Sequence, residues 1–78
     1  MPDKEDKAPE LVQLGDALRA KREGLGITQY EPARRCGMHR TFVAGVERGE
    51  RNVSVLTLLK ITAALECTAQ DTFKKAKL

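Results

Sequence analysis

Residues 28–52 contain two short helical segments separated by a glycine turn, and this pattern limits the possible folds of the chain more than any other. Thr28 is a favourable N-cap, and Glu31 three residues later can complete a capping box with it, in which each side chain bonds a free backbone N–H at the other position. A helix is therefore predicted to begin at Thr28. It should end at Gly37, because glycine readily adopts the left-handed conformation that closes helices.

A second helix is predicted from about His39 to Arg48, with Val43 and Val46 three residues apart on one face. Two helices joined by so short a turn must cross steeply. In a helix-turn-helix of this geometry, the second helix can enter the major groove of B-DNA. The pattern thus predicts a helix-turn-helix at about residues 28–48.

Helical patterns also flank this motif on both sides. Apolar residues three and four apart predict a first helix over about residues 10–23. Ser54 is predicted to cap a fourth helix that reaches Leu65, and Thr68 to begin a fifth. The expected fold is all-α, with one compact five-helix domain over residues 10–78.

Pro32 is the strongest local argument against a regular helix after Thr28. At about the fourth helical position, proline removes the first intrahelical bond to the cap, and its ring crowds the preceding turn. We therefore expect this helix to start late, to kink or to be less stable than usual.

Length and composition exclude several classes of protein. A chain of 78 residues forms at most one domain. No apolar run approaches the roughly 18 to 20 residues that span a bilayer, so we expect a cytoplasmic protein with no membrane partner. Cys36 and Cys67 lack CxxC spacing, and only His39 could join them, so no metal or other cofactor is expected. The polar, charged residues 1–9 are expected to form a flexible tail.

Positive charge is concentrated around the motif. The net charge is +3, but residues 1–10 hold four acidic residues and two lysines, which leaves +5 for the rest of the chain. Residues 34–51 hold five arginines and two glutamates. This distribution places positive charge where DNA phosphates would lie, although a charge cluster of this size also suits an ordinary solvated face.

From Leu14 to Phe73 the chain resembles the repressor/Cro-like helix-turn-helix domain of the XRE family of bacterial and phage transcription regulators. The residues that carry the resemblance are Gly15, Leu18, Arg19, Arg22, Thr28, Gln29, Ala33, Gly37, Glu47, Arg48, Gly49, Arg51, Asn52, Leu59, Ala63, Leu65 and Phe73. The segment HRTFVAGVERGERN is further similar to a subgroup of small stand-alone regulators, which includes the controller proteins of restriction-modification systems. Pro32 departs from the family, which usually has an apolar side chain such as leucine at that position.

The first exposed turn and a half of a groove-inserted helix reaches base edges. Base contacts are therefore expected from Arg40, Thr41, Ala44 and Gly45. Arg40 is the main candidate for specificity, because arginine can bond bidentately to guanine O6 and N7. Phosphate contacts are expected from Gln29, His39, Arg48, Arg51 and Asn52.

The resemblance also implies an ion pair between Arg22 and Glu47 that ties the first helix to the end of the recognition helix. The fourth predicted helix is apolar on most sides, which indicates contacts beyond its own subunit. Leu65 and Phe73 are expected to contribute to a homodimer interface. Such a dimer would bind an inverted repeat with half-sites about 10 base pairs apart.

The resulting expectation is a sequence-specific regulator of transcription that binds double-stranded DNA. No catalytic constellation is found around His39 or elsewhere, so we expect neither an enzyme nor a small-molecule ligand. The alternative is a protein-interaction module, such as an antitoxin or an adaptor, in which DNA binding is secondary.

Overall fold

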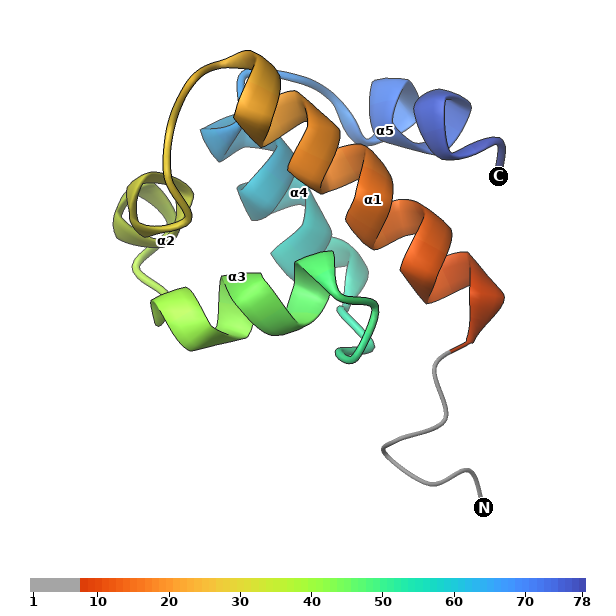
Figure 1. Cartoon of the computed structure of the whole chain (residues 1–78), viewed down its shortest axis with the longest axis horizontal. Helices are drawn as coiled ribbons and strands as arrows, with labels where there is room; N and C mark the ends of the chain where they lie inside the picture. The colour runs from red at the N-terminus through yellow and green to blue at the C-terminus, as the bar shows by residue number, and fades with distance from the viewer. Residues whose placement is uncertain (1–7) are drawn as a thin grey trace.

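Residues 8–78 are described by the computed structural model, and within them the chain forms five helices and no strand (Figure 1). The helices are α1 (Pro9–Gly24), α2 (Tyr30–Cys36), α3 (Arg40–Glu47), α4 (Val55–Ala64) and α5 (Ala69–Ala76). The expected all-α, five-helix fold is therefore confirmed. Of the tail expected at residues 1–9, residues 1–7 lie outside the described part. Pro9 is already the first residue of α1, where a missing N–H costs no bond.

The helices pack around one apolar core. α1 contacts both α3 and α5, α2 contacts α3 and α4, and α4 also contacts α5 (Figure 1). The core cluster consists of Leu14, Leu18, Val46, Leu58, Ile61 and Leu65. Leu65 is only 2% exposed, because its position at the C-cap of α4 turns its side chain into this cluster. The prediction that Leu65 lies in a dimer interface is therefore wrong.

The helix expected to begin at Thr28 begins later. Gln29 is the N-cap of α2, and no side chain makes a capping hydrogen bond there. The expected capping box between Thr28 and Glu31 does not form, because Glu31 instead accepts hydrogen bonds from Arg34 and Arg35 on the next turn of its own helix. The hydrogen bond from Arg34 is the main reason that the pKa of the Glu31 carboxyl is lowered, and the bond from Arg35 lowers it further.

The later start of α2 explains how Pro32 is tolerated. It is the third residue of α2, within the first turn, where backbone N–H groups have no intrahelical partner. The missing N–H of proline therefore removes no helical bond, and the ring is fully buried. We expected Pro32 to cause a late start, a kink or lower stability, and the structure contains the late start.

Local signals determine the other helix ends as expected. α2 closes at Gly37 in the left-handed conformation, with φ of 69°. The Ser54 side chain accepts a hydrogen bond from the backbone N–H of Thr57 at 3.1 Å and so caps α4. Thr68 and Asp71 form a full capping box at the start of α5.

α1 and α3 cross at very close range, and Gly15 permits it. A Cβ atom at this position would lie 2.4 Å from the carbonyl oxygen of Val46 and 2.6 Å from that of Glu47. Only a residue without a side chain fits between two backbones this close. The crossing brings the next turns of α1, with Arg19 and Arg22, beside the end of α3.

Candidate nucleic-acid interface

One buried carboxylate ties the end of α3 to α1 and to the start of α2. The Glu47 side chain is 3% exposed. Arg22 binds it bidentately, with its Nε donating to Oε2 at 2.6 Å and its Nη2 donating to Oε1 at 3.1 Å. Gln29 Nε2 donates to the same Oε1 at 2.9 Å, and Arg19 Nε lies 3.6 Å from it. The structure thus contains the pair that the family resemblance implied, and adds Gln29 and Arg19 to it.

The network keeps Glu47 ionised despite its burial. Burial is the largest single influence and by itself raises the pKa of the carboxyl, because it disfavours the charged form. The hydrogen bonds from Arg22 and Gln29, together with the charges of Arg22 and Arg19, outweigh burial, so the net pKa of Glu47 is lowered. In turn, the hydrogen bond to Glu47 raises the pKa of Arg22. The three helices are therefore joined by a charged cluster at neutral pH.

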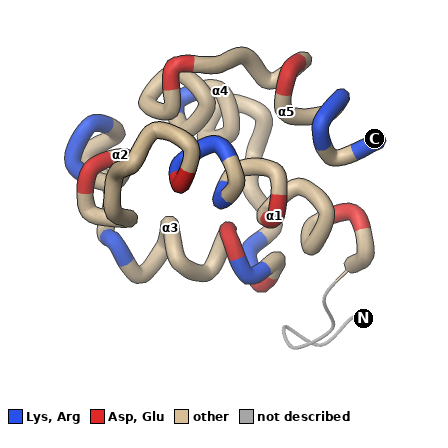
Figure 2. Tube along the Cα trace, turned by 45° about the horizontal axis from the view of Figure 1, so that its top comes forward, with Lys and Arg blue, Asp and Glu red and all other residues tan. Residues whose placement is uncertain are grey.

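The first turn of α3 presents two of the residues expected to read bases, Arg40 and Thr41. Arg40 is partly buried, Thr41 is exposed, and His39 is exposed as the N-cap, although its side chain makes no capping bond. Figure 2 shows basic residues at both ends of α3. A shallow hollow of about 480 Å³ lies between α2 and α3 beside this turn. It is lined by Tyr30, Ala33, Arg34, Met38, His39, Arg40 and Thr41.

Two of the expected base contacts are corrected by the structure. Ala44 is 4% exposed and Gly45 is also buried, so neither offers its surface to a groove. Ala44 is turned inward because α3 is packed by α1 and α2 together. Gly45 is covered by Arg51, since a Cβ there would lie 3.0 Å from Arg51 Cγ. The guanidinium of Arg51 lies over the ring of Phe42, 5.7 Å from its centroid.

Phe42 belongs to the same surface, because the Arg51 side chain lies over its ring. The sequence contains one indication of this, because Phe42 directly follows Arg40 and Thr41 and so lies in the same helical turn. Arg48 and Asn52 are exposed beyond the end of α3, where Arg48 Nε donates to Glu50 at 3.0 Å. Phosphate contacts remain predictions for all five residues named for them.

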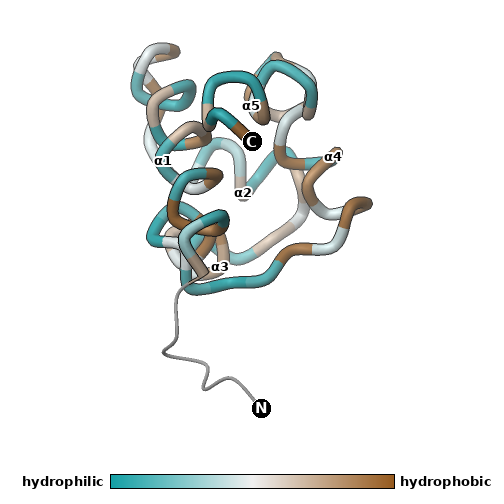
Figure 3. The backbone as a smooth tube through the Cα atoms, turned by 90° about the vertical axis from the view of Figure 1, so that its right-hand side faces the viewer, coloured by the Kyte–Doolittle hydropathy of each residue, from teal (hydrophilic) through white to brown (hydrophobic). Residues whose placement is uncertain are grey.

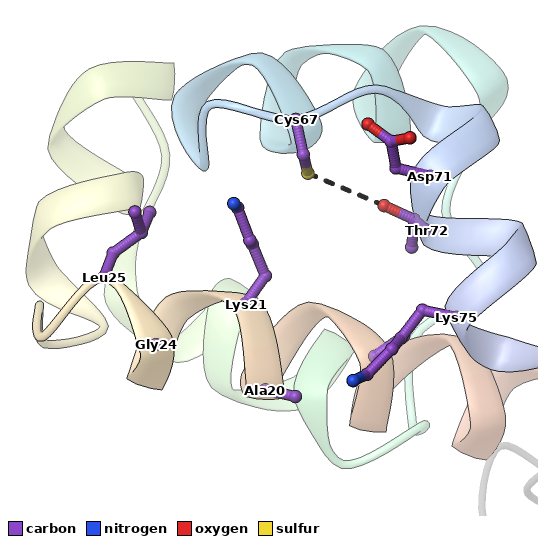
Figure 4. A pocket seen from close by; sticks show the side chains of 9 residues that line it. Ala20, Lys21, Gly24, Leu25, Cys67, Asp71, Thr72 and Lys75 are labelled. Carbon is purple, nitrogen blue, oxygen red and sulfur yellow. Dashed lines mark hydrogen bonds between the residues drawn. The ribbon is translucent and has the colours of Figure 1, made fainter.

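A second hollow lies on another face, between α1 and α5 (Figure 4). It has a volume of about 370 Å³ and is lined by Ala17, Ala20, Lys21, Gly24, Leu25, Cys67, Asp71, Thr72 and Lys75. Figure 4 shows Lys21 extending into it and Cys67 Sγ beside Thr72 Oγ1, at 3.7 Å. Within residues 8–78 every buried side-chain nitrogen and oxygen has a hydrogen-bond partner, so no orphaned polar group marks this hollow as a ligand site.

α2 and α3, joined by the turn at Gly37, have the arrangement of a helix-turn-helix, and a known protein family of that description matches the sequence. Residues 18–71 match the profile of a protein family described as helix-turn-helix. The chain belongs to this helix-turn-helix family. In the part of the chain that the structure describes, no helix is long and apolar enough to cross a membrane.

Several helix-turn-helix proteins are similar over most of the chain. The crystal structure of the restriction-modification controller protein C.AhdI from Aeromonas hydrophila has 39% sequence identity, covers 85% of this chain and 100% of its own, and has a TM-score of 0.81. The controller protein C.Esp1396I, solved as a tetramer with its natural 35 base-pair operator, has 26% identity, covers 87% of this chain and 90% of its own, and has a TM-score of 0.80.

Sequence comparison leads to the same group of helix-turn-helix proteins. The control protein C.SmaI of Serratia marcescens is 38% identical over 52 residues, which are 67% of this chain. The chain spans 62% of the length of C.SmaI and 62% of the length of a hypothetical transcription factor from Neisseria meningitidis, which is 36% identical. The predicted resemblance to XRE-type regulators and controller proteins is confirmed.

Proposed function

We propose that this protein is a sequence-specific transcription regulator of the controller type, which binds double-stranded DNA with α3 in the major groove. The main support for this proposal is the position of the side chains on the first turn of α3. There Arg40 and Thr41 reach the surface on a helix fixed to the rest of the fold through Glu47. The operator complex of the similar protein C.Esp1396I supports this assignment.

The proposed contacts divide into two groups. Arg40 reads a guanine and Thr41 makes a small contact beside it, because both lie on the first turn of α3, where Thr41 is exposed and Arg40 partly exposed. Contacts to phosphates fix the register of the protein on the duplex without reading sequence. We assign them to Gln29, His39, Arg48, Arg51 and Asn52.

We further propose that the protein acts as a homodimer through α4. Its exposed apolar side chains replace Leu65 in this role: Val55 and Leu56 are each 73% exposed, and Leu59 is 47% exposed. Hydrophobic segments of α4 lie along the outer edge of the molecule in Figure 3. Burying such side chains against a second copy removes apolar area from water. Phe73 on α5, 39% exposed, remains in the proposed interface.

The test is selection of bound duplexes from random DNA, followed by titration of the enriched sequence and a scrambled duplex at two salt concentrations. We expect an inverted repeat with half-sites about 10 base pairs apart. We also expect the preference for it to persist when salt weakens both complexes. Absence of any enriched sequence would contradict the proposal and favour the protein-interaction module, in which the helix-turn-helix is a scaffold.

A further inference from the structure

Tyr30 is an aromatic residue that the core does not use. It is the first residue of α2 and is 67% exposed, whereas burial is what usually stabilises an aromatic side chain. The guanidinium of Arg40 lies over its ring, with Cζ 5.3 Å from the ring centroid. This distance is within the range of a cation–π contact. The ring therefore touches the side chain that we assign to base reading.

A second contact holds Arg40 from the side of Gln29. The Glu47 carboxylate only accepts hydrogen bonds, so the Gln29 amide must turn its NH₂ group toward Glu47, to which it donates at 2.9 Å. That orientation directs Gln29 Oε1 away from Glu47, and Arg40 Nη1 donates to this oxygen at 3.3 Å. Arg40 is thus linked through Gln29 to the buried carboxylate at the other end of α3.

Together these contacts leave most of the hydrogen-bonding edge of Arg40 available. The Tyr30 ring lies 5.3 Å from the guanidinium carbon and accepts no conventional hydrogen bond from it, and Gln29 takes one N–H of the five that the group carries. A bidentate bond to guanine needs two more, along the edge. A long arginine side chain that is already held in place loses less conformational freedom when it binds.

We propose that Tyr30 is a positioning residue, whose ring holds the guanidinium of Arg40 in the orientation that reads a guanine. The inference rests on the proposed function of the first turn of α3. It assigns specificity to a residue of α2 that need not contact a base itself. Its contribution acts through Arg40, and it vanishes when Arg40 is absent.

The test compares Tyr30→Leu, which removes the ring, with Tyr30→Phe, which keeps it, on the selected operator and on a scrambled duplex. Tyr30→Leu should weaken operator binding about two- to fivefold, as expected for an exposed cation–π contact, and leave scrambled binding unchanged. Tyr30→Phe should bind as the parent does. In an Arg40→Ala background, Tyr30→Leu should have no further effect. Because Tyr30 is exposed, all variants should keep the parental circular dichroism spectrum.

A measurement without DNA separates this inference from the proposed function. The Tyr30 ring should shift the side-chain NMR signals of Arg40 in the free parent and in Tyr30→Phe, and the shift should be lost in Tyr30→Leu. An unchanged Arg40 spectrum, or an equal loss of binding to both duplexes in Tyr30→Leu, would overturn the inference alone. A parent that prefers no operator would overturn the proposed function and the inference with it.

Discussion

The single residue Glu47 joins three helical elements of this fold. Its carboxylate accepts hydrogen bonds from Arg22 of α1 and from Gln29 at the start of α2, and it belongs to α3. Burial of an ion pair is costly, and this one is offset by bidentate geometry and the added amide donor. The orientation of α3 therefore depends on a charge.

Replacing Glu47 with glutamine should destabilise the fold by about 3–5 kcal/mol, because Arg22 would keep its charge without the partner that compensates for its burial. Denaturant unfolding monitored by circular dichroism measures this change. Glu31→Gln is the matched control, since Glu31 pairs with Arg34 and Arg35 at the surface, and it should change stability little. Equal effects of the two variants would contradict the role of Glu47.

The same carboxyl predicts how stability depends on pH. Folding lowers the pKa of Glu47 below its ordinary value of 4.5, so its stabilisation is complete above that pH and is lost as pH falls through the lower, folded pKa. The difference in unfolding free energy between the parent and Glu47→Gln should therefore shrink on acidification below pH 4.5. Unfolding curves from pH 7 to pH 3 measure it, and a constant difference would contradict this prediction.

The two proposed kinds of DNA contact also differ at the scale of single residues. Arg40→Ala should relax base preference at one position of each half-site and cost roughly 1–3 kcal/mol of operator binding. Arg48→Ala should weaken binding to all duplexes alike and flatten the salt dependence by about one unit of slope. Titrations of operator, scrambled and single-base variant duplexes distinguish them. If both variants behaved alike, the sorting of contacts would be wrong.

At the scale of helices, the site depends on how closely α1 approaches α3. Gly15 lies at this crossing, and the carboxylate of Glu47 lies one to two turns further along α1, beside Arg19 and Arg22. A helix sequence with a larger residue at the crossing would hold the two axes further apart. The arginines would then no longer reach Glu47 at hydrogen-bonding distance.

Gly15→Ala should therefore destabilise the protein by about 1–3 kcal/mol or more, although alanine favours helices, because the atoms it meets are rigid backbone oxygens. Gly24→Ala is the matched control, since a Cβ there has no neighbour within 4 Å. That change should be neutral or stabilise by up to about 1 kcal/mol. Thermal unfolding measures both, and a Gly15→Ala protein as stable as the parent would refute a tight crossing.

At the scale of the whole molecule, the subunit leaves apolar surface uncovered. The core takes in one side of α4 through Leu58 and Ile61, whereas Val55, Leu56 and Leu59 remain outside. Five short helices around one small core cannot fully enclose a helix that is apolar on most sides. A second copy supplies the missing layer in the arrangement that we propose, and it also pairs two α3 helices on one operator.

Leu56→Glu should produce monomers, because it places a charge in the proposed interface without disturbing the core. Sedimentation velocity over a range of concentrations measures the oligomeric state. Ala20→Glu, an equal change of charge at an exposed position of α1, should leave it unchanged. The affinity of the monomer for an operator half-site should be close to its affinity for nonspecific DNA, because the contact with the second half-site is lost. An unaltered sedimentation profile for Leu56→Glu would remove α4 from the interface.

Features that depend on neighbours along the chain could be predicted from the amino-acid sequence. Ser54 and Thr68 cap the helices that follow them, and Gly37 ends α2, because caps and turns are formed by residues within a few positions of one another. The all-α class, the five helices and the helix-turn-helix follow from the same local signals. Arg22 and Glu47 were paired only through the family resemblance.

Which side of each helix is covered could not be predicted in this way, because it depends on how the helices pack together. Ala44 faces the core because α3 is packed by two helices, and Leu65 closes the core instead of an interface. Gln29 turns toward Glu47 and Arg40, and Tyr30 lies beneath Arg40, across a turn that periodicity does not describe. Helical periodicity gives the spacing of a face, whereas its burial depends on partners far away in the sequence, and those exist only once the helices have packed.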